Sequence, residues 1–124
     1  MNKQRPKNLN LMSISFPVTA ISSILHRITG VFLVIGIPFL LYVLGQALNS
    51  PQGFNEASAI VSAGFGKLVL WATLAAITFH IIAGVRHLLM DAGIGETLEG
   101  GMLGSKIVLL LGIAAAIGLG VWLW

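Results

Sequence analysis

Three long apolar runs are the feature that most limits what this chain can fold into. They extend over roughly residues 28–48, 68–90 and 107–124. A helix that crosses the hydrocarbon core of a bilayer needs about 20 residues at about 1.5 Å each, so every run is long enough or nearly so. The composition agrees, because 56% of the residues are hydrophobic and only 9% are charged. The sequence therefore predicts an all-α integral membrane protein with three transmembrane helices.

We interpret the chain as one membrane-anchor domain, residues 1–124, without an internal repeat. Residues 1–17 are largely polar and are expected to form an N-terminal segment on the cytoplasmic surface. The three helices are expected at about residues 18–48, 60–90 and 104–124.

Local breaks in the pattern predict a kink and two connections. Pro38 lacks a backbone N–H and should kink the first helix. Residues 49–58 are rich in turn formers and are expected to connect the first two spans on the outer side, and the glycine-rich residues 91–105 connect the last two on the inner side. Small residues in the last span have the spacing that lets another helix approach closely: Ala114 with Gly118, and Ala116 with Gly120.

The basic residues indicate a topology. Most of the seven precede the first span or flank the inner connection: Lys3, Arg5, Lys7, Arg27, Arg86 and Lys106. Positive residues favour the cytoplasmic side, so the N-terminus and the inner connection should face the cytoplasm and the C-terminus the opposite side. The bases form neither a block nor one exposed face, so the net charge of +3 does not indicate nucleic-acid binding.

Cysteine is absent from the chain. Disulfides, cysteine nucleophiles and thiolate-held iron-sulfur clusters are therefore excluded in this polypeptide. Any cluster chemistry must come from a partner.

The second apolar run contains a polar stripe, in the segment HIIAGVRHLLMD. At about 100° per residue, His80, Gly84, His87 and Asp91 fall within a sector of roughly 60° on one helix face. Gly84 removes a side chain between the two histidines and leaves room for something flat or bulky. His80 should lie about 15 Å inside the inner end of its helix, where ionisable groups usually face a cavity, a partner or a cofactor.

A second polar stripe, in SSILHRITG, should meet the first one. Ser23, His26, Arg27 and Gly30 share a face of the first helix, and the early part of that helix returns to the same side as the late part of the second. One deep histidine below a cluster of cations suits a haem: neutral imidazole for the iron, apolar walls for the macrocycle and cations for the propionates.

The same residues also have ordinary explanations. His80 can simply hydrogen-bond another helix. Arg27 can anchor a helix end at phosphate level, and Arg86, offset from the stripe by about 120°, is better placed for that role than for the stripe. His87 can hydrogen-bond Asp91 four residues away.

A low-spin haem needs a second axial ligand. His26 and His87 are both expected to lie much nearer the interface than His80, so neither readily reaches the opposite side of the same deep iron. We therefore expect a second chain to supply the opposing ligand.

The Arg5-Pro6 pair, SSILHRITG at residues 22–30 and HIIAGVRHLLMD at residues 80–91 resemble the cytochrome b membrane-anchor subunits of succinate dehydrogenase (respiratory complex II). The likeness is to the larger anchor of the bacterial type and covers nearly the whole chain. Such a protein is not an enzyme by itself.

The resemblance implies a place in the tricarboxylic acid cycle and the aerobic respiratory chain. A flavoprotein subunit oxidises succinate, an iron-sulfur subunit relays electrons, and two anchors in the lipid bilayer reduce ubiquinone. Haem b would lie between this chain and the second membrane-anchor subunit, with His80 as the iron's axial ligand. The resemblance places Ser23 and Arg27 at the quinone site and His26 and Arg27 at the haem propionates.

Three alternatives stay open. The same architecture can anchor a quinol:fumarate reductase, and a haem-free structural anchor would explain the helices and the basic interface. A small proton transporter would use the intramembrane histidines, but no acidic residue lies deep within the spans.

RPKNLNL follows a shorter bacterial pattern than the S-P-H of other branches, and the start lacks an Arg- and Ser-rich transit segment, which favours a bacterial inner membrane.

Overall fold

The computed structural model describes residues 10–124, so the Arg5-Pro6 pair and most of the expected cytoplasmic segment lie outside the described residues. Within the described part the chain forms helices and no strand. Their bounds are Leu11–Ser13 for the 3-10 helix η1, Val18–Asn49 for α1, Pro51–Ser62 for α2, Gly64–Asp91 for α3 and Leu98–Leu123 for α4. The predicted all-α fold class is confirmed.

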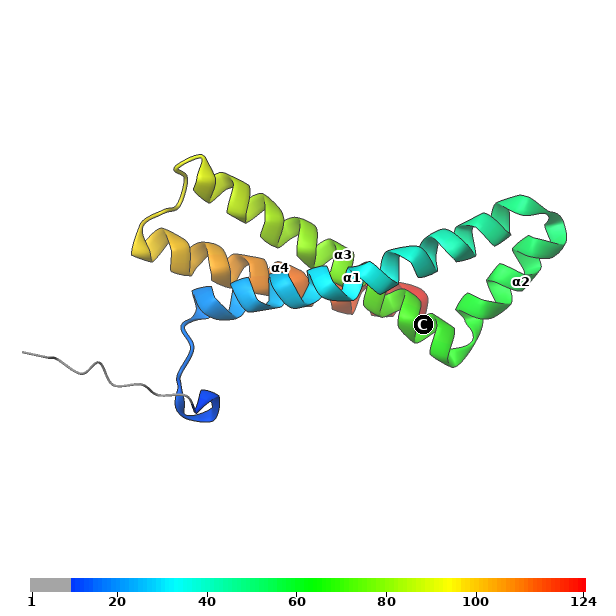
Figure 1. Cartoon of the computed structure of the whole chain (residues 1–124), viewed down its shortest axis with the longest axis horizontal. Helices are drawn as coiled ribbons and strands as arrows, with labels where there is room; N and C mark the ends of the chain where they lie inside the picture. Colours follow the sequence, from blue (N-terminus) through cyan, green and yellow to red (C-terminus); the bar gives the residue numbers. More distant parts are fainter. Residues whose placement is uncertain (1–9) are drawn as a thin grey trace, which may run out of the picture.

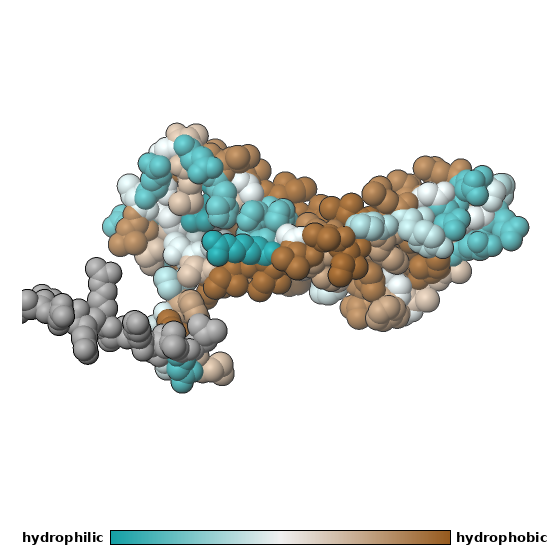
Figure 2. Space-filling model, viewed as in Figure 1, coloured by the Kyte–Doolittle hydropathy of each residue, from teal (hydrophilic) through white to brown (hydrophobic). Residues whose placement is uncertain are grey.

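Three helices of the described part are long and apolar enough to cross a membrane, as the sequence predicts. α1, α3 and α4 contain 32, 28 and 26 residues, and about 20 are sufficient. Figure 2 shows hydrophobic residues over the middle of the molecule and hydrophilic residues gathered at its two ends. A bundle whose middle lies in hydrocarbon has this distribution.

α1, α3 and α4 lie beside one another and alternate in direction. Figure 1 shows the start of α1, the end of α3 and the start of α4 at one end of the molecule, which we call the inner end. α3 packs against both α1 and α4. At the other end, α2 connects α1 to α3 beyond the point where α4 stops.

The outer connection differs from the prediction, because residues 51–62 form the helix α2 rather than turns. The Ser50 hydroxyl accepts a hydrogen bond from the Gly53 N–H at 3.0 Å, and Pro51 lies in the first turn. Serine and proline are common in turns and also at helix starts. The residues that indicated a turn therefore begin a helix.

The ends of the spans also differ from the prediction. The helix expected at about 60–90 is divided, since α2 ends at Ser62 and α3 begins at Gly64. α4 begins at Leu98 rather than at about 104, because the Thr97 hydroxyl caps it by accepting from the Gly100 N–H at 3.0 Å. The glycines had suggested a loop there, but a capped N-terminus tolerates them.

α1 continues through Pro38 as one helix. Figure 1 shows it changing direction in its middle part, and the missing N–H of a proline is the usual cause of such a bend. The predicted kink therefore agrees with the fold.

One of the two small-residue pairs of α4 contacts another helix, and the other is exposed. The Trp71 indole of α3 donates a hydrogen bond to the Ala116 carbonyl at 2.8 Å and lies against Gly120, so this pair contacts another helix as predicted. Ala114 and Gly118 are exposed, and a Cβ on Gly118 would meet nothing within 4 Å among the described residues. The pairs are two residues apart and face opposite sides of α4, so only one of them can face α3.

Glycines also let large side chains reach the backbone of a neighbouring helix. A Cβ on Gly112 of α4 would lie 2.5 Å from Cδ2 of Phe79 on α3, and a Cβ on Gly36 of α1 would lie 2.8 Å from Cγ2 of the fully buried Thr73. Both distances are shorter than packed carbon atoms tolerate. α3 is thus fixed between α1 and α4 by close contacts.

We expect Gly112→Ala to destabilise the bundle by about 1–3 kcal/mol, because the new methyl group must displace the Phe79 ring. Gly118→Ala is the matched control, since it makes the same helix-favouring change where the space is open. Thermal unfolding of the detergent-solubilised protein in its complex measures both. Equal melting temperatures for the two variants would contradict the predicted contact.

Candidate functional site

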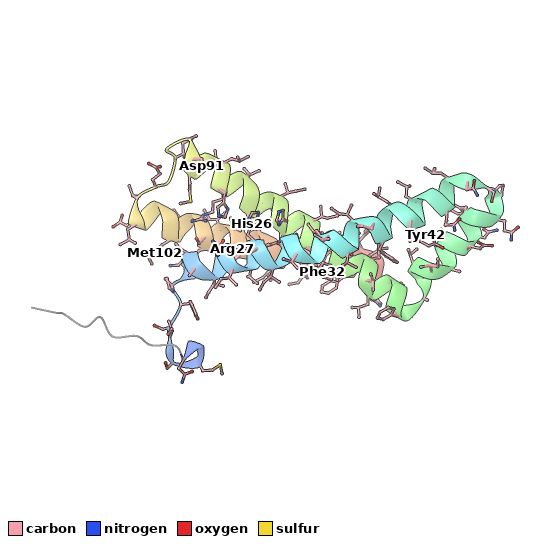
Figure 3. All side chains as sticks on the ribbon, in the orientation of Figure 1. His26, Arg27, Phe32, Tyr42, Asp91 and Met102 are labelled. Atoms are coloured by element: carbon pink, nitrogen blue, oxygen red, sulfur yellow. The ribbon has the colours of Figure 1, made fainter. Side chains whose placement is uncertain are left out.

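Three histidine rings stack against one another in the inner half of the α1–α3 interface. The ring centroids of His26 on α1 and His80 on α3 lie 4.1 Å apart with the planes inclined by 19°. His87 on α3 stacks on the other side of His26, with 4.8 Å between the centroids and 22° between the planes. Figure 3 shows His26 on the side of α1 that faces α3. We call these three residues the histidine stack.

Two glycines make room for the stack. A Cβ on Gly30 of α1 would lie 3.1 Å from Cε1 of His80, and a Cβ on Gly84 of α3 would lie 3.6 Å from Nε2 of His26. Each helix therefore accepts an imidazole of the other against its bare backbone. The room predicted at Gly84 exists, but the flat group beside it is the His26 ring of the same chain.

The prediction that His26 lies much nearer the interface than His80 was wrong. α1 already begins at Val18, so His26 lies about 12 Å from the start of its helix, and His80 lies about 16 Å from the end of α3. Because the two helices are antiparallel neighbours, these similar depths bring the rings to the same level. His87 lies nearer the helix end and still reaches the stack through His26.

The histidine stack is held by hydrogen bonds to its own two helices. The Thr29 hydroxyl on α1 lies 2.9 Å from the His26 carbonyl oxygen and 3.0 Å from His80 Nδ1. His87 Nδ1 lies 2.7 Å from the Ala83 carbonyl oxygen, to which it must donate. The bond between His87 and Asp91 suggested by the spacing is therefore replaced by a backbone contact, and Asp91 is exposed at the end of α3.

Thr29 is a residue that sequence reasoning missed. A threonine in an apolar helix is ordinary, and its hydroxyl usually bonds the carbonyl three or four residues earlier. The available signal was its position, one turn after His26 and directly before Gly30. That position puts it on the helix face that approaches His80.

Two further predicted site residues lie next to the stack on α1 without joining it. Ser23 is half-buried and Arg27 is exposed. Within residues 10–124 neither side chain makes a hydrogen bond or an ion pair, so both keep their donors for another group. Figure 3 shows Arg27 beside His26 on α1.

Fully buried serines are a second feature missed by sequence reasoning. Ser22 on α1 and Ser105 on α4 have no exposed surface, and neither hydroxyl oxygen has a hydrogen-bond partner in the described part of the chain. A Cβ on Gly101 of α4 would lie 3.9 Å from Cγ2 of Thr19, so α1 and α4 pack at this level. Nothing in the sequence distinguishes Ser22 from its neighbour Ser23, which lies on another helix face.

Arg86, for which the spacing favours a role at phosphate level, makes a hydrogen bond to α4. Its guanidinium donates from Nη2 to the Gly101 carbonyl at 3.1 Å, and a Cβ on Gly104 would lie 3.1 Å from its Nε. The two glycines leave the α4 backbone open to a long side chain. Arg86 therefore connects α3 to α4.

The stack is not a self-sufficient metal centre. Stacked rings present their faces to one another, whereas metal ligands must direct nitrogen lone pairs at one point. No group of three potential ligand residues within residues 10–124 could hold a metal ion. His80 is nevertheless suited to ligation as one member of a larger site, because only its Nδ1 is engaged in a hydrogen bond among the described residues.

Known proteins are similar to this chain over most of its length. A family described as succinate dehydrogenase/fumarate reductase transmembrane subunit matches residues 1–119. The succinate dehydrogenase cytochrome b556 subunit of Coxiella burnetii is 38% identical over 125 residues, which cover all of both chains. The corresponding subunit of Paracoccus denitrificans is 39% identical over 95 residues, 77% of this chain and 73% of the relative.

A cytochrome b560 subunit extends the likeness. The succinate dehydrogenase cytochrome b560 subunit of Reclinomonas americana is 32% identical over 129 residues, covering 99% of this chain and 88% of the relative. The family match, the full-length relatives and the three spanning helices agree. The chain therefore belongs to the succinate dehydrogenase/fumarate reductase transmembrane subunits and is a multi-pass membrane anchor of that family.

Proposed function

We propose that this chain binds haem b together with a second membrane-anchor subunit and helps to form the ubiquinone-reduction site of a succinate dehydrogenase complex. The proposal rests on the hydrogen bonding of His80. Its ring is held at Nδ1 by Thr29, and its Nε2 makes no hydrogen bond within the described residues. The curated relatives are named cytochrome b556 and b560 subunits, which supports a b-type haem.

The residues around His80 fit such a group. His80 supplies a nitrogen ligand from within a membrane-spanning helix, where an ionisable residue needs a specific purpose. His26 Nε2 is buried without a hydrogen-bond partner among the described residues, and the exposed Arg27 lies beside it. We assign His26 and Arg27 to the haem propionates, because both can donate charge-assisted hydrogen bonds to carboxylates. When bound, haem supplies one-electron redox chemistry that side chains lack.

A second ligand to the haem iron would come from another polypeptide. His26 and His80 lie face to face with their ring centroids 4.1 Å apart, so their nitrogens do not converge on one point. His87 is farther along the same stack and donates its Nδ1 proton to the backbone. The sequence contains only these three histidines. The second membrane-anchor subunit is therefore the proposed source.

Ser23 and Arg27 are assigned to the quinone. A serine hydroxyl can donate to a quinone carbonyl, and an arginine stabilises the negative charge that develops when an electron arrives before a proton. Both side chains keep their hydrogen-bond donors within residues 10–124. Their place near the start of α1 puts them at the inner end.

The inner end is assigned to the cytoplasmic face of a bacterial inner membrane, with the C-terminus in the periplasm. Arg27, Arg86 and Lys106 all belong to the helix ends that meet there, and Lys67 lies at the start of α3 on the other side. This distribution follows the positive-inside rule. The iron-sulfur and flavoprotein subunits would dock on the cytoplasmic face. Electron flow from quinol to fumarate is the alternative direction, since the family description includes both enzymes.

We expect His80→Ala to remove haem b from the complex purified through this chain. His87→Ala is the matched control, because it removes an imidazole of the same helix whose Nδ1 bonds the backbone. Dithionite-reduced minus oxidised spectra and a pyridine haemochrome assay measure the haem content. An active wild-type complex without haem would contradict the proposal and leave a structural anchor.

We expect Ser23→Ala to lower kcat/KM for ubiquinone reduction by roughly tenfold, the effect of one hydrogen bond of about 1.4 kcal/mol in the transition state. Haem content should change little. Ser58→Ala, on the exposed surface of α2 at the other end of the molecule, serves as the control. Unchanged quinone turnover in the Ser23 variant would refute the assignment.

A further inference from the structure

The hydroxyl of Thr29 connects the backbone of α1 to the ring of His80. Its oxygen lies 2.9 Å from the His26 carbonyl oxygen and 3.0 Å from His80 Nδ1. Thr29 is only partly exposed, and so is His80. The contact therefore joins two helices by a side-chain hydrogen bond inside the membrane-spanning region.

The donors and acceptors of this contact can be assigned by counting protons. A hydroxyl has one proton, and a carbonyl oxygen can only accept. If the Thr29 proton were directed at His80, two acceptor oxygens would face each other at 2.9 Å with no proton between them. Thr29 therefore donates to the His26 carbonyl and accepts from the N–H at His80 Nδ1. Neutral His80 then carries its proton on Nδ1 and a bare lone pair on Nε2.

We propose that Thr29 is a positioning residue that fixes the tautomer and the orientation of His80, so that Nε2 is the nitrogen offered to a haem iron. The proposal rests on the haem-binding function proposed above. Nε2 is separated from Nδ1 by Cε1, so its lone pair diverges from the bond that Nδ1 makes to Thr29. A hydrogen-bond partner on the second ring nitrogen is what orients a ligating histidine and raises its basicity.

Gly30 provides the space that this contact requires. The His80 ring lies so close to α1 that a Cβ at residue 30 would be 3.1 Å from its Cε1. A side chain there would push the ring away and lengthen the 3.0 Å bond from Nδ1 to Thr29. The consecutive residues Thr29 and Gly30 therefore act together, one holding the ring and the other admitting it.

A purely structural role for Thr29 makes a different prediction. Threonine hydroxyls commonly bond a carbonyl of their own helix, and Thr78 on α3 does so with Leu74 at 2.9 Å. Thr78 makes no hydrogen bond to a histidine among the described residues. Thr78→Val is therefore a matched control that removes a back-bonded hydroxyl near the site without removing a ligand's partner.

The test compares Thr29→Val, Thr29→Ser and Thr78→Val with wild type in the complex purified through this chain. The readouts are haem b content, haem loss during washing, the haem midpoint potential and the EPR spectrum of the ferric haem. We expect Thr29→Val to weaken haem retention roughly tenfold or more. Its midpoint potential should rise, because an imidazole without an acceptor at Nδ1 donates less charge to ferric iron. Thr29→Ser and Thr78→Val should match wild type.

Each contrary outcome has a distinct meaning. Wild-type retention, potential and EPR spectrum in Thr29→Val, with haem lost in His80→Ala, would overturn the role of Thr29 and leave the proposed function intact. Equal damage by Thr29→Ser would also overturn it, since side-chain shape and not the hydroxyl would then be responsible. Haem-free wild-type complex would overturn the proposed function itself. If Thr29→Val does not assemble, Thr29→Ala compared with Thr29→Ser carries the same test without the added methyl group.

Discussion

The close approach of α1 to α3 at Gly30 and Gly84 determines what the inner half of this molecule can hold. Each glycine admits a histidine ring of the opposite helix against bare backbone. The contact is tightest at Gly30, where a Cβ would lie 3.1 Å from Cε1 of His80 and the ring would have to shift. The bond between Thr29 and His80 and the proposed use of the free His80 nitrogen both depend on this approach.

The bilayer makes such contacts necessary. Polar groups in hydrocarbon have no water to bond, so they must find partners in the protein or serve a purpose that justifies their cost. Several side chains in the spans find hydrogen-bond partners in the protein: Trp71 bonds Ala116, Thr73 bonds Val69 and Thr78 bonds Leu74. The buried Nε2 of His26 has no hydrogen-bond partner among the described residues.

The sequence predicted the parts of the fold that depend on apolar length and helical periodicity. Three spans, the meeting of two polar stripes and the contact at Ala116 and Gly120 follow from those patterns alone. The helix α2 did not, because Ser50 and Pro51 are as typical of turns as of helix starts. The predicted depth of His26 was wrong, because that depth depends on the residue at which α1 enters the membrane. Counting residues along the sequence does not determine that residue. Thr29 was missed because its hydrogen bond to His80 spans 51 residues of sequence.

The proposed ligation of a haem iron by His80 Nε2, with Thr29 holding Nδ1, can be tested by a structure of the assembled complex at a resolution that separates the two ring nitrogens. We expect iron density on His80 Nε2, a ligand from another subunit, and Thr29 Oγ1 still within hydrogen-bond distance of Nδ1. Iron on a different residue, or a His80 ring turned away from Thr29, would contradict it.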